Sequence, residues 1–323
     1  MRRDPYGNQL LVRMHYKHGA YWYVYRGKWK RLGDNYNRAL REYADATAAG
    51  GSMIPLLQKT YDAYDLRVKH GTLRESTLSN YLSAKSNLLL AFKNMDPAEV
   101  TPSDIKQFRS HYYGTKPNAG NRALVVLREA FDIGMDLGLC EYNPASQVRR
   151  IPEHKRTRRL TDAEFARIRA CAKGKLPIIM DVLYYTGQRI GDVLAIRQSD
   201  ISDGVLHITQ QKTGAVIEIG IGPKLEKAIA AARSGTVTGL WLFSRHGRPM
   251  VYYTVQSAYK AACKRARVEG TTLHDIRAKS ITDVSLAGGD AMTLAGHKDQ
   301  KMTDRYIREK LPLRAKSLDS LRQ

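Results

Sequence analysis

The sequence predicts a multidomain, mainly α protein with three successive parts. These are a small N-terminal domain of three β-strands and one helix, an all-α domain, and a mixed α+β domain. The chain has 323 residues and is 43% hydrophobic, which is enough for more than one core. Alternating apolar and polar residues open the chain, helical periodicity follows, and a basic run at 149–159 separates the last part.

The first part, residues 1–51, is predicted from alternation at 10–14 and from the segments YWYVYR and KWKRL. Glycines mark the turns between three short strands, and a helical stretch runs from about Asn35 to the glycine pair at 50–51. About half of the strand aromatics must form a core against this helix, because successive side chains point to opposite faces. A basic, aromatic sheet of this kind can also enter the major groove of DNA. We expect the DNA contacts of this part to include Arg13, Lys28 and Lys30.

The second part, residues 52–148, is predicted to be helical throughout. NYLSAKSNLLLAF carries an apolar stripe, and RALVVLREAFDIGMDLG forms a further helix that ends at Gly138. In TPSDIKQF, Thr101 is an N-cap, Pro102 takes the first helical position and Asp104 completes a capping box. Nothing in this block indicates catalysis.

The charge balance indicates a polyanionic partner. Fifty-three Lys and Arg residues against thirty-one Asp and Glu residues give a formal charge of +22 and a pI near 9.9. Nucleic acid is the first interpretation, and an anionic membrane surface is the alternative. No apolar run approaches the roughly 18 to 20 residues that span a bilayer, and the N-terminus lacks the features of a signal peptide. We expect a cytoplasmic protein, either nucleoid-associated or in the host cytoplasm, whose three cysteines stay reduced.

The segment RRIPEHKRTRR, residues 149–159, is predicted to be a basic interdomain linker. Such runs are most often solvated charge, but a basic strap between domains is also well placed to cross a DNA backbone. The candidate phosphate contacts in it are Arg149, Arg150, Lys155, Arg156, Arg158 and Arg159.

The third part, residues 160–310, opens with LTDAEF, in which Thr161 and Glu164 form a capping box. Four segments then carry chemistry-bearing residues, namely TGQRIGDVLAIRQSDI, LHITQQKTGAVIEIGI, LHDIRAKSITD and LAGHKDQKMTDRYIREK. Each is weak alone: an Arg-Asp pair three residues apart is ordinarily a surface ion pair, and hairpin lysines ordinarily only solvate. Their order is the signal, and it runs Arg189, Lys212, His274, Arg277, His297, Tyr306.

This ordered set resembles the tyrosine recombinase, or phage integrase, family, and the N-terminal part resembles the arm-binding domain of lambda-type integrases. The resemblance implies a tyrosine recombinase catalytic domain at 160–310, a core-site-binding domain at 52–148 and an arm-site-binding domain at 1–51. The chain departs from the family pattern at Ala278, where a further histidine is common, and in a short segment around Gly288.

The resemblance implies that Tyr306 attacks a DNA phosphate and forms a covalent 3′-phosphotyrosine. Arg189, Arg277, His274 and His297 would then bind the nonbridging oxygens, because the transition state gains negative charge. Lys212 is the expected general acid, His274 the expected base or relay, and Asp192 a supporting residue. A covalent link conserves the phosphodiester energy, so we expect neither a cofactor such as ATP nor a metal.

The implied partners are double-stranded DNA attachment sites of core and arm type, contacted by a homotetramer. A host DNA-bending protein and an excisionase are possible further partners, and the tail at 311–323 would dock in trans on a neighbouring protomer or pack on its own domain. Two alternatives stay open beside the integrase: a type IB topoisomerase-like nicking and resealing enzyme, and a DNA-binding regulator that lost catalysis. The N-terminal basic unit favours integration, and the complete residue set argues against the regulator.

Overall fold

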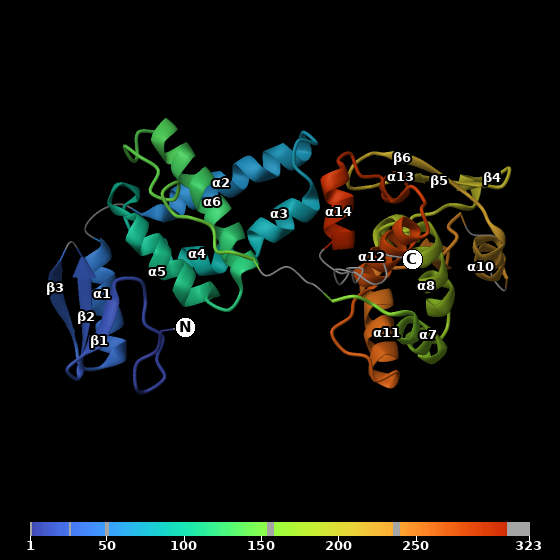
Figure 1. Ribbon diagram of the computed structural model, residues 1–323. Helices are drawn as coiled ribbons and strands as arrows, with labels where there is room; N and C mark the ends of the chain where they lie inside the picture. Colours follow the sequence, from blue (N-terminus) through green and yellow to red (C-terminus); the bar gives the residue numbers. More distant parts are fainter. Residues whose placement is uncertain (1, 26, 49–51, 154–157, 235–239, 309–323) are drawn as a thin grey trace, which may run out of the picture. The chain divides into compact units, whose positions relative to one another are not determined.

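Figure 1 shows the computed structural model, which describes residues 2–25, 27–48, 52–153, 158–234 and 240–308. The chain folds into two compact units, residues 1–154 and 155–323. The division falls inside the basic segment 149–159, where the sequence predicts a linker. Lys155, Arg156 and the tail at 311–323 lie outside the described residues.

The first unit begins with an antiparallel sheet in the order β1-β2-β3, packed on one helix (Figure 1). This confirms the predicted three strands and helix. The pleat turns Tyr21, Tyr23 and Leu32 toward the helix, where they form a small core with Ala39 and Tyr43. The elements are β1 (Met14–Lys17), β2 (Ala20–Tyr25), β3 (Lys28–Gly33) and α1 (Tyr36–Ala48).

The rest of the first unit is helical, as predicted. Thr101 and Asp104 form the expected capping box and Pro102 opens the helix. The stretch NYLSAKSNLLLAF, predicted as one helical stripe, is divided between two helices around Ser83 and Ala84. The helices are α2 (Met53–Lys69), α3 (Glu75–Leu82), α4 (Lys85–Phe92), η1 (Pro97–Glu99), α5 (Pro102–Tyr113) and α6 (Pro117–Asp136).

Arg13 connects the sheet to this helical block. Its side chain is 3% exposed; Nε donates to Asp104 Oδ1 at 2.7 Å and Nη2 to the carbonyl of Glu99 at 2.9 Å. Nη1 donates to the hydroxyl of Tyr23 at 3.0 Å. The prediction that Arg13 contacts DNA is therefore wrong, because its guanidinium is buried and its charge is neutralised by a buried carboxylate.

Helices α7 to α12 of the second unit contribute to its large apolar core, and the antiparallel sheet β4-β5-β6 adds to it. The capping box of Thr161 and Glu164 is present as predicted. The central helix α8 contacts α7, α10, α11 and α12. The elements are α7 (Asp162–Cys171), α8 (Leu176–Thr186), α9 (Ile190–Leu194), η2 (Gln198–Asp200), β4 (Ile201–Ser202), β5 (Val205–Thr209), β6 (Val216–Gly220), α10 (Pro223–Arg233), β7 (Ser244–Arg245), β8 (Arg248–Pro249), α11 (Tyr252–Arg265), α12 (Leu273–Leu286), α13 (Ala291–Ala295) and α14 (Gln300–Arg308).

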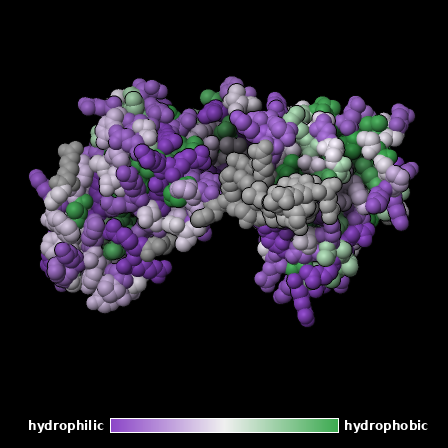
Figure 2. Space-filling model, in the orientation of Figure 1, coloured by the Kyte–Doolittle hydropathy of each residue, from purple (hydrophilic) through white to green (hydrophobic). Residues whose placement is uncertain are grey.

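Hydrophilic side chains cover most of the visible face of each unit, with hydrophobic ones scattered among them (Figure 2). Within the described part of the chain, no helix combines the length and the apolar content required to cross a membrane.

Candidate active site

Arg189 lies in the short connection between α8 and α9. Helix α8 ends at Thr186 and is followed by Gly187, whose φ of 63° is left-handed and whose Cβ, if present, would lie 3.0 Å from Ser280 Oγ. Arg189 then adopts extended backbone at the N-cap position of α9, so it stands just before the helix. Its Nη1 lies 3.8 Å from Oδ2 of the buried Asp192, three residues on.

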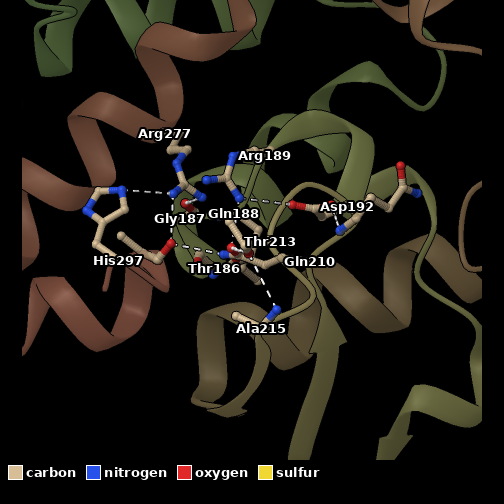
Figure 3. Close-up of polar contacts among 12 residues, drawn as sticks. Thr186, Gly187, Gln188, Arg189, Asp192, Gln210, Thr213, Ala215, Arg277 and His297 are labelled. Carbon is tan, nitrogen blue, oxygen red and sulfur yellow. Dashed lines mark hydrogen bonds and ion pairs between the residues drawn. The ribbon is translucent and has the colours of Figure 1, made fainter. Parts of the chain in front are cut away.

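Arg277 is the most deeply buried of the candidate catalytic residues whose side chains the structure describes. It lies on α12, is 1% exposed, and donates from Nη1 to the carbonyl of Gly187 at 2.9 Å and from Nη2 to that of Ala295 at 2.8 Å (Figure 3). Two carbonyls from distant segments therefore fix the plane of the guanidinium. His274, one helical turn earlier as the sequence predicts, is exposed at the start of α12.

His297 lies beside Arg277. It follows the left-handed Gly296 and is 7% exposed, with Nε2 3.3 Å from Arg277 Nη2 and Nδ1 2.9 Å from Thr303 Oγ1. A guanidinium has only donors, so Nε2 accepts from Arg277 and Nδ1 carries the proton that it donates to Thr303. Burial, together with the smaller effect of the charges of Arg277 and Arg189, lowers the pKa of His297 from 6.5 to about 4. His297 is thus neutral at physiological pH.

Lys212 occupies the exposed turn between β5 and β6, as predicted. The turn is attached to the arginine site at its base, because the backbone N–H of Gln211 donates to Asp192 Oδ1 at 2.9 Å. Asp192 therefore contacts both the turn that carries Lys212 and Arg189.

Tyr306 belongs to α14, whose backbone contacts α12 and α13. The position of the Tyr306 side chain lies outside what the structure describes. Thr303, in the same helix and three residues earlier, is 1% exposed and bonds to His297. The helix of the expected nucleophile is thus joined directly to the histidine of the site.

The structure brings Arg189, Arg277 and His297 together and holds Lys212 on an adjoining turn. A further residue, Gln210, lies between them and is absent from the residues predicted from the sequence. It is fully buried and its side chain bonds to Arg189. The alternation of the strand could have indicated it, because Leu206 and Ile208 are the inward residues of β5 and Gln210 follows at the same spacing. A polar side chain at an inward strand position requires a buried partner.

The basic residues predicted to contact DNA from the linker differ in accessibility. Arg149 and Arg150 are exposed. Arg158 instead donates to Glu164 Oε1 at 2.8 Å and to the carbonyl of Glu269 at 3.0 Å, so its guanidinium is engaged within the second unit. Arg159 is one-third exposed, with Nη2 3.9 Å from Asp283.

The basic residues of the N-terminal sheet lie on both of its faces. Lys30 pairs with Tyr23, a core residue, so Lys30 and its alternate neighbour Lys28 are exposed along the α1 side of the sheet. Arg31 pairs with Trp22 and lies on the opposite face. The residues that share this outer face are His15, Lys17, Trp22, Val24, Trp29 and Arg31.

Comparisons with known proteins find similarity to phage integrases. Residues 152–311 match the phage integrase family. The integrase of Escherichia phage HK022 is 27% identical over 267 residues, covering 76% of this chain and 73% of that protein. The prophage integrase IntE of Escherichia coli K12 is 28% identical over 306 residues, covering 85% of this chain and 81% of the relative.

Solved structures show that the likeness extends along nearly the whole chain. A lambda integrase tetramer bound to a Holliday junction superposes with a TM-score of 0.75 at 22% identity, covering 98% of this chain and 99% of that one. A lambda integrase dimer bound to a core site, comprising residues 75–356 of that protein, gives 0.69 at 24% identity and covers 76% of this chain and 96% of that one. The family match and these relatives identify the chain as a tyrosine recombinase of the phage integrase family, whose members cut and rejoin DNA.

Proposed function

We propose that the protein is the integrase of a phage or another mobile element. In this proposal it cuts and rejoins double-stranded attachment sites through a covalent 3′-phosphotyrosine and a Holliday junction. The observation that carries the proposal is the convergence of Arg189, Arg277 and His297 beside the helix of Tyr306 and the turn of Lys212. Fixed cations on separate rigid elements suit a phosphate whose charge rises in the transition state.

In the proposed reaction, the phenolic oxygen of Tyr306 forms a bond to phosphorus as the bond from phosphorus to the 5′-oxygen breaks. The phenol proton passes to His274 or through it, and the ammonium of Lys212 protonates the departing 5′-oxygen. A 5′-hydroxyl of the partner strand then attacks the phosphotyrosine and the same transfers run backwards. Neither ATP nor a metal enters these steps.

His297 must change its hydrogen bonding when DNA binds. In the free protein its Nε2 accepts from Arg277, so it cannot donate to a phosphate from that atom. A phosphate oxygen that takes the Arg277 donor would allow the proton to move to Nε2, because Thr303 Oγ1 can either accept from Nδ1 or donate to it. The neutral ring of His297 could then donate a hydrogen bond from Nε2 to the phosphate.

The first unit would supply DNA binding. Arg31 and Lys17 flank Trp22 and Trp29 on the outer face of the sheet, a combination of cations and aromatic surface that suits a DNA groove. We assign this face to arm-type sites and the helical block at 52–148 to core-type sites. The proposed phosphate contacts remain Lys28, Lys30, Arg149 and Arg150. We propose that the protein acts in the cytoplasm as a homotetramer, with a DNA-bending protein and an excisionase as further partners.

The decisive experiment uses labelled suicide substrates that carry candidate attachment sites. The wild-type protein should form a covalent protein–DNA adduct, and the Tyr306→Phe variant should bind the same DNA without forming one. An adduct that persists in Tyr306→Phe would overturn the nucleophile assignment. Exchange of strands between two sites, measured with paired substrates, separates an integrase from a nicking and resealing enzyme.

A further inference from the structure

Gln210 holds the centre of the site with a fully bonded amide. It is the residue after β5 and has no exposed surface. Its Oε1 accepts from Arg189 Nη1 and from Thr213 Oγ1, both at 2.8 Å. Its Nε2 donates to Gln188 Oε1 at 2.7 Å and to the carbonyl of Ala295 at 2.9 Å (Figure 3). These four bonds use both hydrogens and both lone pairs of the amide.

The partners fix which way the amide points. Arg189 can only donate, so it must face the oxygen, and the carbonyl of Ala295 can only accept, so it must face the nitrogen. If the amide were flipped, its NH2 group would face the donor of Arg189 and its oxygen would face the carbonyl oxygen of Ala295. One orientation is therefore strongly preferred, and it sets the position of the Arg189 guanidinium, whose contact with Asp192 is longer at 3.8 Å.

The same residue also sets the lysine turn. The backbone N–H of Gln210 donates to the carbonyl of Ala215, and its carbonyl accepts from Gly214, both at 2.8 Å, so Gln210 closes the loop that carries Lys212. The side chain of Thr213, next to Lys212, bonds to the same Oε1 that holds Arg189. A shift of the turn and a shift of the arginine are thus coupled through one oxygen atom.

We propose that Gln210 is a positioning residue that couples the general-acid turn of Lys212 to the phosphate-binding Arg189. The inference rests on the proposed function and adds to it. Gln210 Oε1 would hold the turn of the general acid and the phosphate-binding Arg189 in fixed relative positions, and Thr213 would connect Gln210 Oε1 to the turn. Gln210 itself touches neither the substrate nor the proton in flight.

The test compares a substrate with its normal 5′-oxygen leaving group and one with a bridging 5′-sulfur. Sulfur leaves without a proton, so the sulfur substrate bypasses the general acid but still needs the arginines. Thr213→Val removes only the bond from Gln210 Oε1 to the turn. It should slow cleavage of the oxygen substrate roughly tenfold and leave cleavage of the sulfur substrate near the wild-type rate. Gln210→Met removes the bonds to both the turn and Arg189, and should slow cleavage of the oxygen substrate roughly a hundredfold, with partial rescue by the sulfur substrate.

The neighbouring Gln211 provides a matched control, because its side chain is exposed and only its backbone contacts Asp192. Gln211→Met should cleave both substrates at the wild-type rate, and Thr213→Ser should restore the hydroxyl and the rate. Equal losses on both substrates in Thr213→Val, or wild-type rates in both Thr213→Val and Gln210→Met, would overturn the coupling while the wild-type adduct left the proposed function intact. Absence of any wild-type adduct would overturn the proposed function itself and the coupling with it.

Discussion

Gln210 and Arg277 donate hydrogen bonds to a single acceptor, the carbonyl oxygen of Ala295, at 2.9 Å and 2.8 Å. Ala295 ends α13, and the next residue, Gly296, turns the chain with a φ of 62°. This turn aims the carbonyl at both donors and at the same time places His297 beside Arg277. The geometry of three candidate site residues therefore depends on the backbone of one glycine.

The Gly296→Ala substitution should damage this arrangement. An added Cβ would lie 2.5 Å from Ile217 Cδ1 and 2.7 Å from Gln210 Nε2, in a left-handed conformation that already disfavours a side chain. We expect the free energy of unfolding to fall by about 2 to 4 kcal/mol and adduct formation to be lost. Urea denaturation and suicide-substrate assays measure the two effects.

Gly174 is a matched control for this change. Its φ is 61°, nearly that of Gly296, but no atom lies within 4 Å of an added Cβ. Gly174→Ala should cost only about 1 kcal/mol and preserve the adduct. If the two substitutions had equal costs, the crowding at Gly296 would have no energetic weight.

The bond between His297 and Thr303 should matter both to the fold and to the reaction. Thr303→Val keeps the shape of the side chain but leaves a buried Nδ1–H without its acceptor, which should cost about 1 to 3 kcal/mol. It should also slow adduct formation, because α14 carries Tyr306. Thr303→Ser should recover most of both losses, whereas the exposed Thr293 should tolerate valine. Wild-type adduct rates in Thr303→Val would remove this contact from the mechanism.

The lowered pKa of His297 predicts a direction for acid stability. Its native pKa of about 4 lies below the ordinary value of 6.5, so the unfolded chain binds the proton more readily than the folded one does. The stabilising contribution is complete above about pH 6.5 and declines as the pH falls toward 4, with about 2 kcal/mol lost between pH 7.5 and 5. Titration of the His297 ring by NMR checks the value directly; a midpoint near 6.5 would contradict it.

Much of the fold could be predicted because its signals are local. The capping boxes at Thr101 and Thr161 and the hairpin around Lys212 all depend on residues within a few positions of one another. The order of the six chemical positions indicated the family, because their identities are set by what a phosphate requires and not by the surrounding sequence.

The rest depends on tertiary partners that a linear pattern does not reveal. Arg13 is expected to contact DNA because it belongs to a basic, aromatic N-terminal part, yet it forms a buried ion pair with Asp104, ninety-one positions away. The sequence pattern does not indicate Gln210, because three of the four partners of its side chain lie in distant segments, at 188–189 and at Ala295. In both cases the role of the polar side chain depends on the distant group with which it is buried and hydrogen-bonded.

The Arg13–Asp104 pair gives a last prediction, which separates a structural cation from a DNA-binding one. Arg13→Met should lower the free energy of unfolding of the first unit by about 3 kcal/mol, because it leaves the Asp104 carboxylate buried without its counter-charge. It should leave unchanged the slope of log Kobs for DNA binding against log salt concentration. Arg31→Gln, on the exposed face of the sheet, should do the reverse: little loss of stability and a slope smaller by about 0.9. A reduced salt slope in Arg13→Met with stability intact would return Arg13 to the DNA interface, and an unchanged slope in Arg31→Gln would remove the outer face of the sheet from it.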